Sequence, residues 1–148
     1  MNKPVLAVDI DEVLAHFIPI LAEFHNLHYN KEGQGTHMSA ASFSSFEFHK
    51  VWGGSPSEAS VKMENFYESV HFKEIPPIAD ALQACLSLKM NFDLQIITAR
   101  QTKLREVTVD WVEKHYPGIF SHYHFGNHWS TEGVSRSKPQ VGRCVHVY

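Results

Sequence analysis

Hydrophobic and polar positions follow two patterns along the chain, and each pattern predicts one kind of element. Short runs rich in aliphatic, β-branched or aromatic residues predict strands at 5–8, 92–98, 122–125 and 144–148. Apolar residues spaced three or four apart predict amphipathic helices at 16–28, 56–70, 78–89 and 104–115. The unbroken apolar run at 5–8 suits a strand that is buried on both faces, as in a parallel sheet.

The order of these elements indicates an α/β fold. Strands and helices alternate in the second half of the chain, which is the pattern of right-handed parallel crossovers. No strand is predicted between residues 17 and 72, so this region is interpreted as a small helical insertion after the first strand. The sequence therefore predicts one domain over residues 1–148, with a parallel sheet covered by helices and an insertion at about 17–72.

The insertion contains a specific signal for the start of a helix. Ser55 is predicted as the N-cap, Pro56 as the first helical residue and Glu58 as the partner that completes a capping box. The apolar face of this helix is predicted to consist of Ala59, Met63, Phe66, Tyr67 and Val70.

An aromatic cluster precedes that helix and contains Phe43, Phe46, Phe48 and Trp52. Because Phe and Trp are common core residues, we expect the cluster to form the core of the insertion. Stacking against a nucleoside or another flat substrate is the alternative.

Composition narrows the class of protein. The 148 residues are 43% hydrophobic and 20% charged, as in globular proteins, and the net charge of −3 gives no reason to expect binding to nucleic acid or to an anionic membrane. No apolar run approaches the ~20 residues that span a bilayer. The two cysteines, Cys85 and Cys144, lack metal-binding or redox spacing, so a reduced, cytoplasmic location is expected.

Asp9 and Asp11 directly follow the first predicted strand. Carboxylates in that position are costly to desolvate without a cation or hydrogen bonds, and the carboxyl edge of a parallel sheet is where α/β folds bind ligands. The pair can supply a nucleophile, a second carboxyl for proton transfer and oxygen ligands for Mg²⁺. An isolated D-x-D tripeptide is more often a turn, but its position after a strand favours a functional site.

The segment from Asp9 to Leu14, D-I-D-E-V-L, resembles the first motif of the haloacid dehalogenase (HAD) superfamily, D-x-D-x-[TV]-[LV]. Glu12 differs from the small residue, often Gly, at its position in the motif. The resemblance implies a Rossmann-like three-layer α/β/α core with a small helical cap inserted after the first strand, similar to the 5′(3′)-deoxyribonucleotidase-like group. It also implies that Asp9 is the nucleophile, that Asp11 is the general acid/base and that both help to hold Mg²⁺.

Three further residues match later parts of the HAD pattern. Thr98 ends the second core strand, where the superfamily places a Ser or Thr that hydrogen-bonds the phosphoryl group. Lys138 comes later in the chain, in the region where the superfamily has a lysine that neutralises phosphoryl charge. Arg100 is expected either to contact phosphate or the rest of the substrate, or to form a surface ion pair.

The fourth motif of the superfamily, an acidic residue or pair that completes the Mg²⁺ site, has no counterpart after the predicted strand at 144–148. The resemblance implies a Mg²⁺-dependent phosphatase that acts on a small phosphorylated metabolite or nucleotide through an aspartyl-phosphate. The alternative is a catalytically impaired or truncated HAD-like protein that binds a ligand or self-associates. In that case an exposed terminal strand favours a homodimer.

Overall fold

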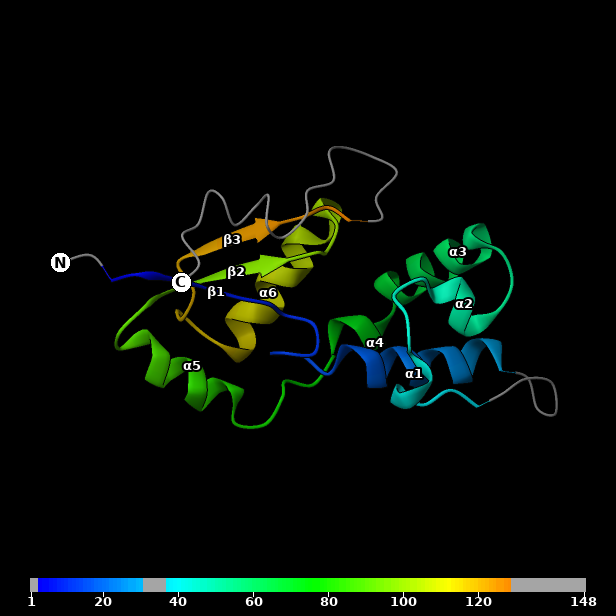
Figure 1. Cartoon of the computed structure of the whole chain (residues 1–148), viewed down its shortest axis with the longest axis horizontal. Coiled ribbons are helices and arrows are strands. Elements are labelled where there is room, and N and C mark those ends of the chain that lie inside the picture. Colours follow the sequence, from blue (N-terminus) through cyan, green and yellow to red (C-terminus); the bar gives the residue numbers. More distant parts are fainter. Residues whose placement is uncertain (1–2, 31–36, 129–148) are drawn as a thin grey trace. The chain divides into compact units, whose positions relative to one another are not determined.

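The structure is a computed structural model, and it describes residues 3–30 and 37–128. The chain divides into two compact units (Figure 1). The first comprises residues 1–15 and 77–148 and is called the α/β unit below. The second, residues 16–76, is called the helical unit. The prediction that both belong to one domain with a cap at about 17–72 stays a prediction.

The α/β unit is built on a parallel sheet. In its described part, β1 (Val5–Val8), β2 (Asp93–Thr98) and β3 (His122–Phe125) lie in the order β1-β2-β3. Helix α5 (Ala81–Lys89) precedes β2, and the short 3-10 helix η2 (Thr102–Leu104) and α6 (Arg105–His115) connect β2 to β3. These parallel connections through helices confirm the predicted α/β class.

Burial differs between the strands of this sheet. Residues 94–98 of the central strand β2 are buried, because β2 has a hydrogen-bonded neighbour on each side. All four residues of β1 are only half-buried. The expectation of a first strand buried on both faces was therefore wrong for the described sheet, in which β1 lies at the edge.

The helical unit contains no strand among its described residues, as predicted. Its elements are α1 (Phe17–Tyr29), η1 (Ala40–Ser42), α2 (Phe48–Trp52), α3 (Pro56–Glu68) and α4 (Val70–Lys73). Phe66 is fully buried at the centre, and its ring lies 5.3–5.6 Å from the rings of Phe17, Phe24 and Phe72. Apolar aromatic packing therefore forms the core of this unit.

The predicted capping box is confirmed at the start of α3. The Ser55 hydroxyl accepts a hydrogen bond from the Glu58 amide at 3.2 Å, and the Glu58 carboxylate accepts one from the Ser55 amide at 2.7 Å. The preceding Gly54 has φ +79°, and a Cβ there would lie 2.7 Å from the same carboxylate. One predicted core position was wrong: Val70 is 59% exposed, because α3 ends at Glu68 and Ser69 caps the separate helix α4.

The aromatic cluster upstream of α3 is only partly buried. The rings of Phe48 and Trp52 stack with their centroids 5.1 Å apart, and Phe43 packs edge-on against both. Phe46 is 74% exposed and so does not belong to the core.

Candidate active site

The loop after β1 is wound tightly around one carbonyl group. The Ile10 oxygen accepts hydrogen bonds from the amides of Val13, Leu14 and Ala15 at 2.8–3.2 Å. Ile10, Leu14 and Ala15 are buried, so they anchor the loop in the core. These contacts hold the backbone that carries Asp9 and Asp11 at the carboxyl end of β1, where α/β folds bind ligands.

Side-chain and backbone contacts from later parts of the chain hold the same loop. The Tyr116 hydroxyl donates to the Leu14 oxygen at 2.9 Å, and the Ile78 amide donates to that oxygen at 2.8 Å. Burial raises the pKa of Tyr116 to about 12, so its hydroxyl stays protonated and remains a donor at neutral pH. The loop is therefore secured from the segments on either side of β2.

Glu12 has an unusual backbone conformation in this loop. Its φ is +61°, in the left-handed region that favours glycine. The side chain is exposed, and the Glu12 amide donates to the Ala15 oxygen at 2.9 Å. The turn thus gives a physical reason for the small residue, often Gly, that the HAD motif has at this position.

Hydrogen bonds connect the loops that follow β2 and β3 at the carboxyl end of the sheet. Thr98 is fully buried, and its hydroxyl accepts a hydrogen bond from the Arg100 amide at 3.2 Å. The Thr98 and Ala99 oxygens accept from the amides of Gly126 and His128 at 2.7 and 3.0 Å. The Asn127 side chain accepts from the Thr102 amide at 3.0 Å, which joins the two loops.

The Arg100 side chain links the two strand ends. Its Nη2 and Nε donate to the Asp11 Oδ1 and Oδ2 atoms at 2.6 and 3.1 Å, in a bidentate ion pair. Its Nη1 donates to the Thr108 hydroxyl of α6 at 3.2 Å. The side chain of Arg100 is 5% exposed and that of Asp11 27%, so this is a largely buried ion pair that opens towards solvent on the carboxylate side.

The structure brings four of the predicted residues, Asp9, Asp11, Thr98 and Arg100, to the carboxyl end of the sheet. Val8 pairs with Ile96 in parallel register, so Asp9, which follows β1, and Thr98, which ends β2, both lie at the carboxyl end of the sheet. Asp9 Oδ1 accepts a hydrogen bond from the Ile10 amide at 2.9 Å. Asp11 joins the Thr98 loop through Arg100. Lys138 and the segment where a fourth motif would be expected lie outside the described residues.

Sequence reasoning missed Thr108 and Asn127, both of which are buried and hydrogen-bonded at this edge. A signal for Thr108 was present, because it stands four residues from both Leu104 and Val112 and therefore lies on the apolar face of its helix. A buried hydroxyl on such a face requires a partner. No local signal identified Asn127, whose φ of +54° depends on the paired loops.

The groups of this site that fit Mg²⁺ are the oxygens of Asp9 and Asp11. Carboxylate oxygens suit Mg²⁺, which is often bound by one or two carboxylates together with water and substrate phosphate. Both Asp11 side-chain oxygens accept hydrogen bonds from Arg100, and the Asp9 Oδ1 accepts one from the Ile10 amide. Within residues 3–30 and 37–128, no group of three or more His, Cys, Asp or Glu side chains could share a metal ion.

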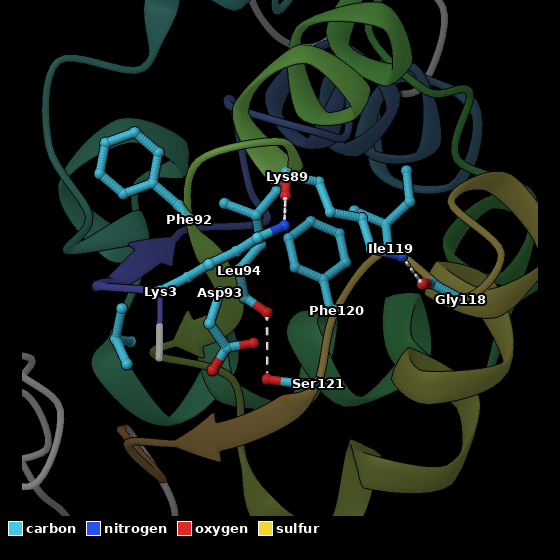
Figure 2. A pocket seen from close by; sticks show the side chains of 10 residues that line it. Lys3, Lys89, Phe92, Asp93, Leu94, Gly118, Ile119, Phe120 and Ser121 are labelled. Carbon is cyan, nitrogen blue, oxygen red and sulfur yellow. Dashed lines mark hydrogen bonds between the residues drawn. The ribbon is translucent and has the colours of Figure 1, made fainter. Parts of the chain in front are cut away.

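A separate pocket lies at the amino end of the sheet, where β1 and β2 begin. It has a volume of about 580 Å³ and is lined by residues that include Lys3, Asp93, Phe92 and Phe120. The Lys3 side chain donates a hydrogen bond to the Lys89 backbone oxygen, and the Lys89 side chain donates one to the Gly118 backbone oxygen (Figure 2). Among the described site residues, Asp9, Asp11, Thr98 and Arg100 do not line this pocket.

Residues 3–129 match the family model described as 5′ nucleotidase, deoxy (pyrimidine), cytosolic type C protein (NT5C). The chain belongs to this family. No curated protein sequence matches it significantly. None of the helices in the described part of this nucleotidase-family chain is long and apolar enough to cross a membrane.

Solved structures confirm the HAD-like fold of this nucleotidase-family chain. The haloacid dehalogenase-like hydrolase SP0104 from Streptococcus pneumoniae has a similar structure, with a TM-score of 0.69 and a sequence identity of 15%. The match covers 97% of this chain and 68% of the SP0104 chain. The putative HAD-hydrolase YfnB from Bacillus subtilis, whose structure was solved with bound magnesium, is similar with a TM-score of 0.53 and 12% identity, over 85% and 66% of the two chains. The chain thus spans about two thirds of the length of each.

Proposed function

We propose that this chain is a Mg²⁺-dependent phosphatase that hydrolyses a small phosphorylated metabolite or nucleotide through an aspartyl-phosphate. The observation that carries the proposal is that Asp9, Asp11 and Thr98 lie at the carboxyl end of one parallel sheet. Asp11 is paired there with Arg100 and is 27% exposed to solvent. Membership of a nucleotidase family supports a phosphate ester as the substrate class and makes deoxyribonucleoside monophosphates the first compounds to test.

In the first step, an oxygen of Asp9 attacks phosphorus and forms the aspartyl-phosphate, while the bond between phosphorus and the ester oxygen breaks. Asp11 gives its proton to that ester oxygen. In the second step, Asp11 takes a proton from water, whose oxygen attacks phosphorus. The bond between phosphorus and Asp9 breaks, and inorganic phosphate is released.

The other residues bind or neutralise the phosphoryl group. The Thr98 hydroxyl accepts a hydrogen bond from the Arg100 amide, and its own O–H can donate a hydrogen bond to a phosphoryl oxygen. Lys138 would neutralise phosphoryl charge. Mg²⁺ held by Asp9, with an oxygen from Asp11, would offset the charge on the transferring group. We assign the helical unit the role of the substrate-selecting cap.

A phosphomonoester panel tests this function. The panel contains deoxyribonucleoside 5′- and 3′-monophosphates, alkyl phosphates and p-nitrophenyl phosphate, each with Mg²⁺ and with EDTA. Wild-type protein should release phosphate only with Mg²⁺, and Asp9→Asn should abolish release because an amide is no nucleophile at phosphorus. Wild-type activity no higher than that of Asp9→Asn would reject the hydrolase.

The alternative, a HAD-like module that binds or self-associates without turnover, stays a prediction that the same assay separates from the enzyme. Self-association through the strand predicted at 144–148 also stays a prediction. A strict monomer in size-exclusion chromatography with light scattering would contradict it.

A further inference from the structure

Arg100 was expected either to contact phosphate or the rest of the substrate, or to form a surface ion pair. The structure shows an ion pair, with Asp11, but the Arg100 side chain is buried in it. Three of its N–H groups, one on each nitrogen, donate to the two Asp11 oxygens and to the Thr108 hydroxyl. The Nε and Nη2 edge, which matches a phosphate or a carboxylate bidentately, faces Asp11. To bind phosphate with that edge, Arg100 would have to release Asp11.

We propose that Arg100 is a positioning residue for Asp11 and that Thr108 holds the guanidinium in place. This inference rests on the proposed phosphatase function. A bidentate pair fixes both oxygens of a carboxylate, and so fixes the rotation of the side chain, which a single hydrogen bond does not. Proton transfer depends on this orientation, because the carboxyl must face the leaving oxygen in the transition state.

The proton balance is unchanged by this role. When the bond between phosphorus and the ester oxygen breaks, the proton of Asp11 moves to that oxygen and Asp11 becomes a carboxylate. Arg100 neither gains nor loses a proton, since a guanidinium stays charged, and it stabilises the carboxylate that forms. Arg100 therefore contributes most when the leaving oxygen needs a proton.

Leaving-group dependence distinguishes positioning from a general structural role. An alkyl phosphate needs protonation of its poor leaving group, whereas p-nitrophenolate leaves without it. We expect Arg100→Met to lower kcat/KM by about 10²-fold on an alkyl phosphate and by less than about 10-fold on p-nitrophenyl phosphate, since general acid catalysis contributes about 10²–10⁴-fold. Arg100→Lys keeps the charge but loses the bidentate contact, so its effect should be intermediate.

Thr108 gives a milder version of the same test. Thr108→Val removes the acceptor of Nη1 with little change in volume, and we expect a loss of a few fold with the same dependence on the leaving group. Thr108→Ser, which keeps a hydroxyl, should restore activity. If Arg100→Met does not fold, as judged by circular dichroism, Arg100→Lys and Thr108→Val keep the test decisive.

Arg105→Met is the matched control. Arg105 is exposed at the start of α6 and lies 5.1 Å from the ring of Phe125. This variant should keep wild-type activity on both substrates. Equal losses on both substrates in the Arg100 and Thr108 variants, or a raised KM with unchanged kcat, would overturn the positioning role. A wild-type protein without phosphatase activity would instead reject the proposed function itself.

Discussion

The two compact units differ sharply in the polar groups that they bury. Of seven buried polar or charged residues in the described ranges, six belong to the α/β unit and only His25 belongs to the helical unit. The six are Gln95, Thr98, Arg100, Gln101, Thr108 and Asn127. Buried polar groups are costly unless they are hydrogen-bonded. The α/β unit thus carries this cost, and all of the six except Gln95 lie at or beyond the carboxyl ends of β2 and β3, where we place the chemistry. The helical unit is stabilised by apolar packing.

The two buried basic side chains show the same contrast. Arg100 forms an ion pair with the Asp11 carboxylate. His25 instead stacks on Trp52 with ring centroids 5.0 Å apart, and its Nε2 lies 3.2 Å from the Lys62 Nζ. Burial and the Lys62 charge lower the pKa of His25 to about 4, so it is neutral at pH 7. The α/β unit therefore buries a charged side chain, whereas the buried basic residue in the described part of the helical unit is a neutral histidine.

The largest expected effect tests whether aromatic packing stabilises the helical unit. Phe66→Ala should destabilise it by about 3–5 kcal/mol, because it removes a fully buried ring that contacts four other aromatic rings. Phe46→Ala is the control in the same unit, since Phe46 is 74% exposed and should cost less than about 0.5 kcal/mol. Urea denaturation followed by circular dichroism measures both, and equal losses would contradict an aromatic core.

The sequence was sufficient for features that depend on neighbouring residues. The strand at 122–125 and the capping box of α3 were predicted correctly, because strand composition and cap chemistry are local. Val70 was misplaced because the chain starts a new helix after Ser69, and a hydrophobic period alone does not reveal this break.

The candidate site was predicted only in part. Asp9, Asp11 and Thr98 could be placed at one sheet edge because parallel strands end together. The partner of Arg100 could not be predicted, since Asp11 lies 89 residues away in the sequence. Neither could the half-burial of β1, which depends on the strand order. The roles assigned to Asp9, Asp11, Thr98 and Lys138 stay predictions.

The second prediction compares a buried ion pair in the α/β unit with an exposed one in the helical unit. Arg100→Met should cost about 2–3 kcal/mol, because it leaves the partly buried Asp11 carboxylate without its cation. Lys50→Met breaks the exposed pair with Glu47 and should cost no more than about 1 kcal/mol.

A double mutant identifies the source of this loss. In Arg100→Met/Asp11→Asn the unpaired charge is gone, so the combined loss should be smaller than the sum of the two single losses. Additive losses in chemical denaturation would show that Arg100 and Asp11 do not stabilise each other.

The third prediction concerns pH and the helical unit. Unfolded His25 takes up a proton near its ordinary pKa of 6.5, whereas the folded side chain does so only near 4. The unfolded state therefore binds more protons between these values, and stability should fall by roughly 2 kcal/mol as pH falls from 6.5 to 4. His25→Phe should remove this part of the pH dependence. Thermal unfolding of both proteins at pH 7, 5.5 and 4 measures the difference, and parallel curves would mean that His25 does not titrate on unfolding.

The smallest expected effect on stability concerns backbone strain, which the α/β unit carries at more non-glycine residues than the helical unit does in the described ranges. All three non-glycine residues with positive φ in the described ranges, Glu12, Asp80 and Asn127, belong to the α/β unit. In the helical unit, the described positions with positive φ are Gly53 and Gly54. The unit with the candidate site thus also carries the backbone strain, as strained residues often cluster near functional sites.

Reciprocal substitutions at Glu12 and Gly53 test this difference. Glu12→Gly should stabilise the protein by up to about 1 kcal/mol, because relief of the left-handed strain outweighs the greater flexibility of glycine in the unfolded chain. Gly53→Ala should destabilise it by about 1 kcal/mol, although a Cβ there would meet nothing within 4 Å, so that its effect comes from the backbone alone. Thermal denaturation measures both. A destabilised Glu12→Gly would show that side-chain contacts of Glu12, and not the shape of the turn, keep a glutamate at this position.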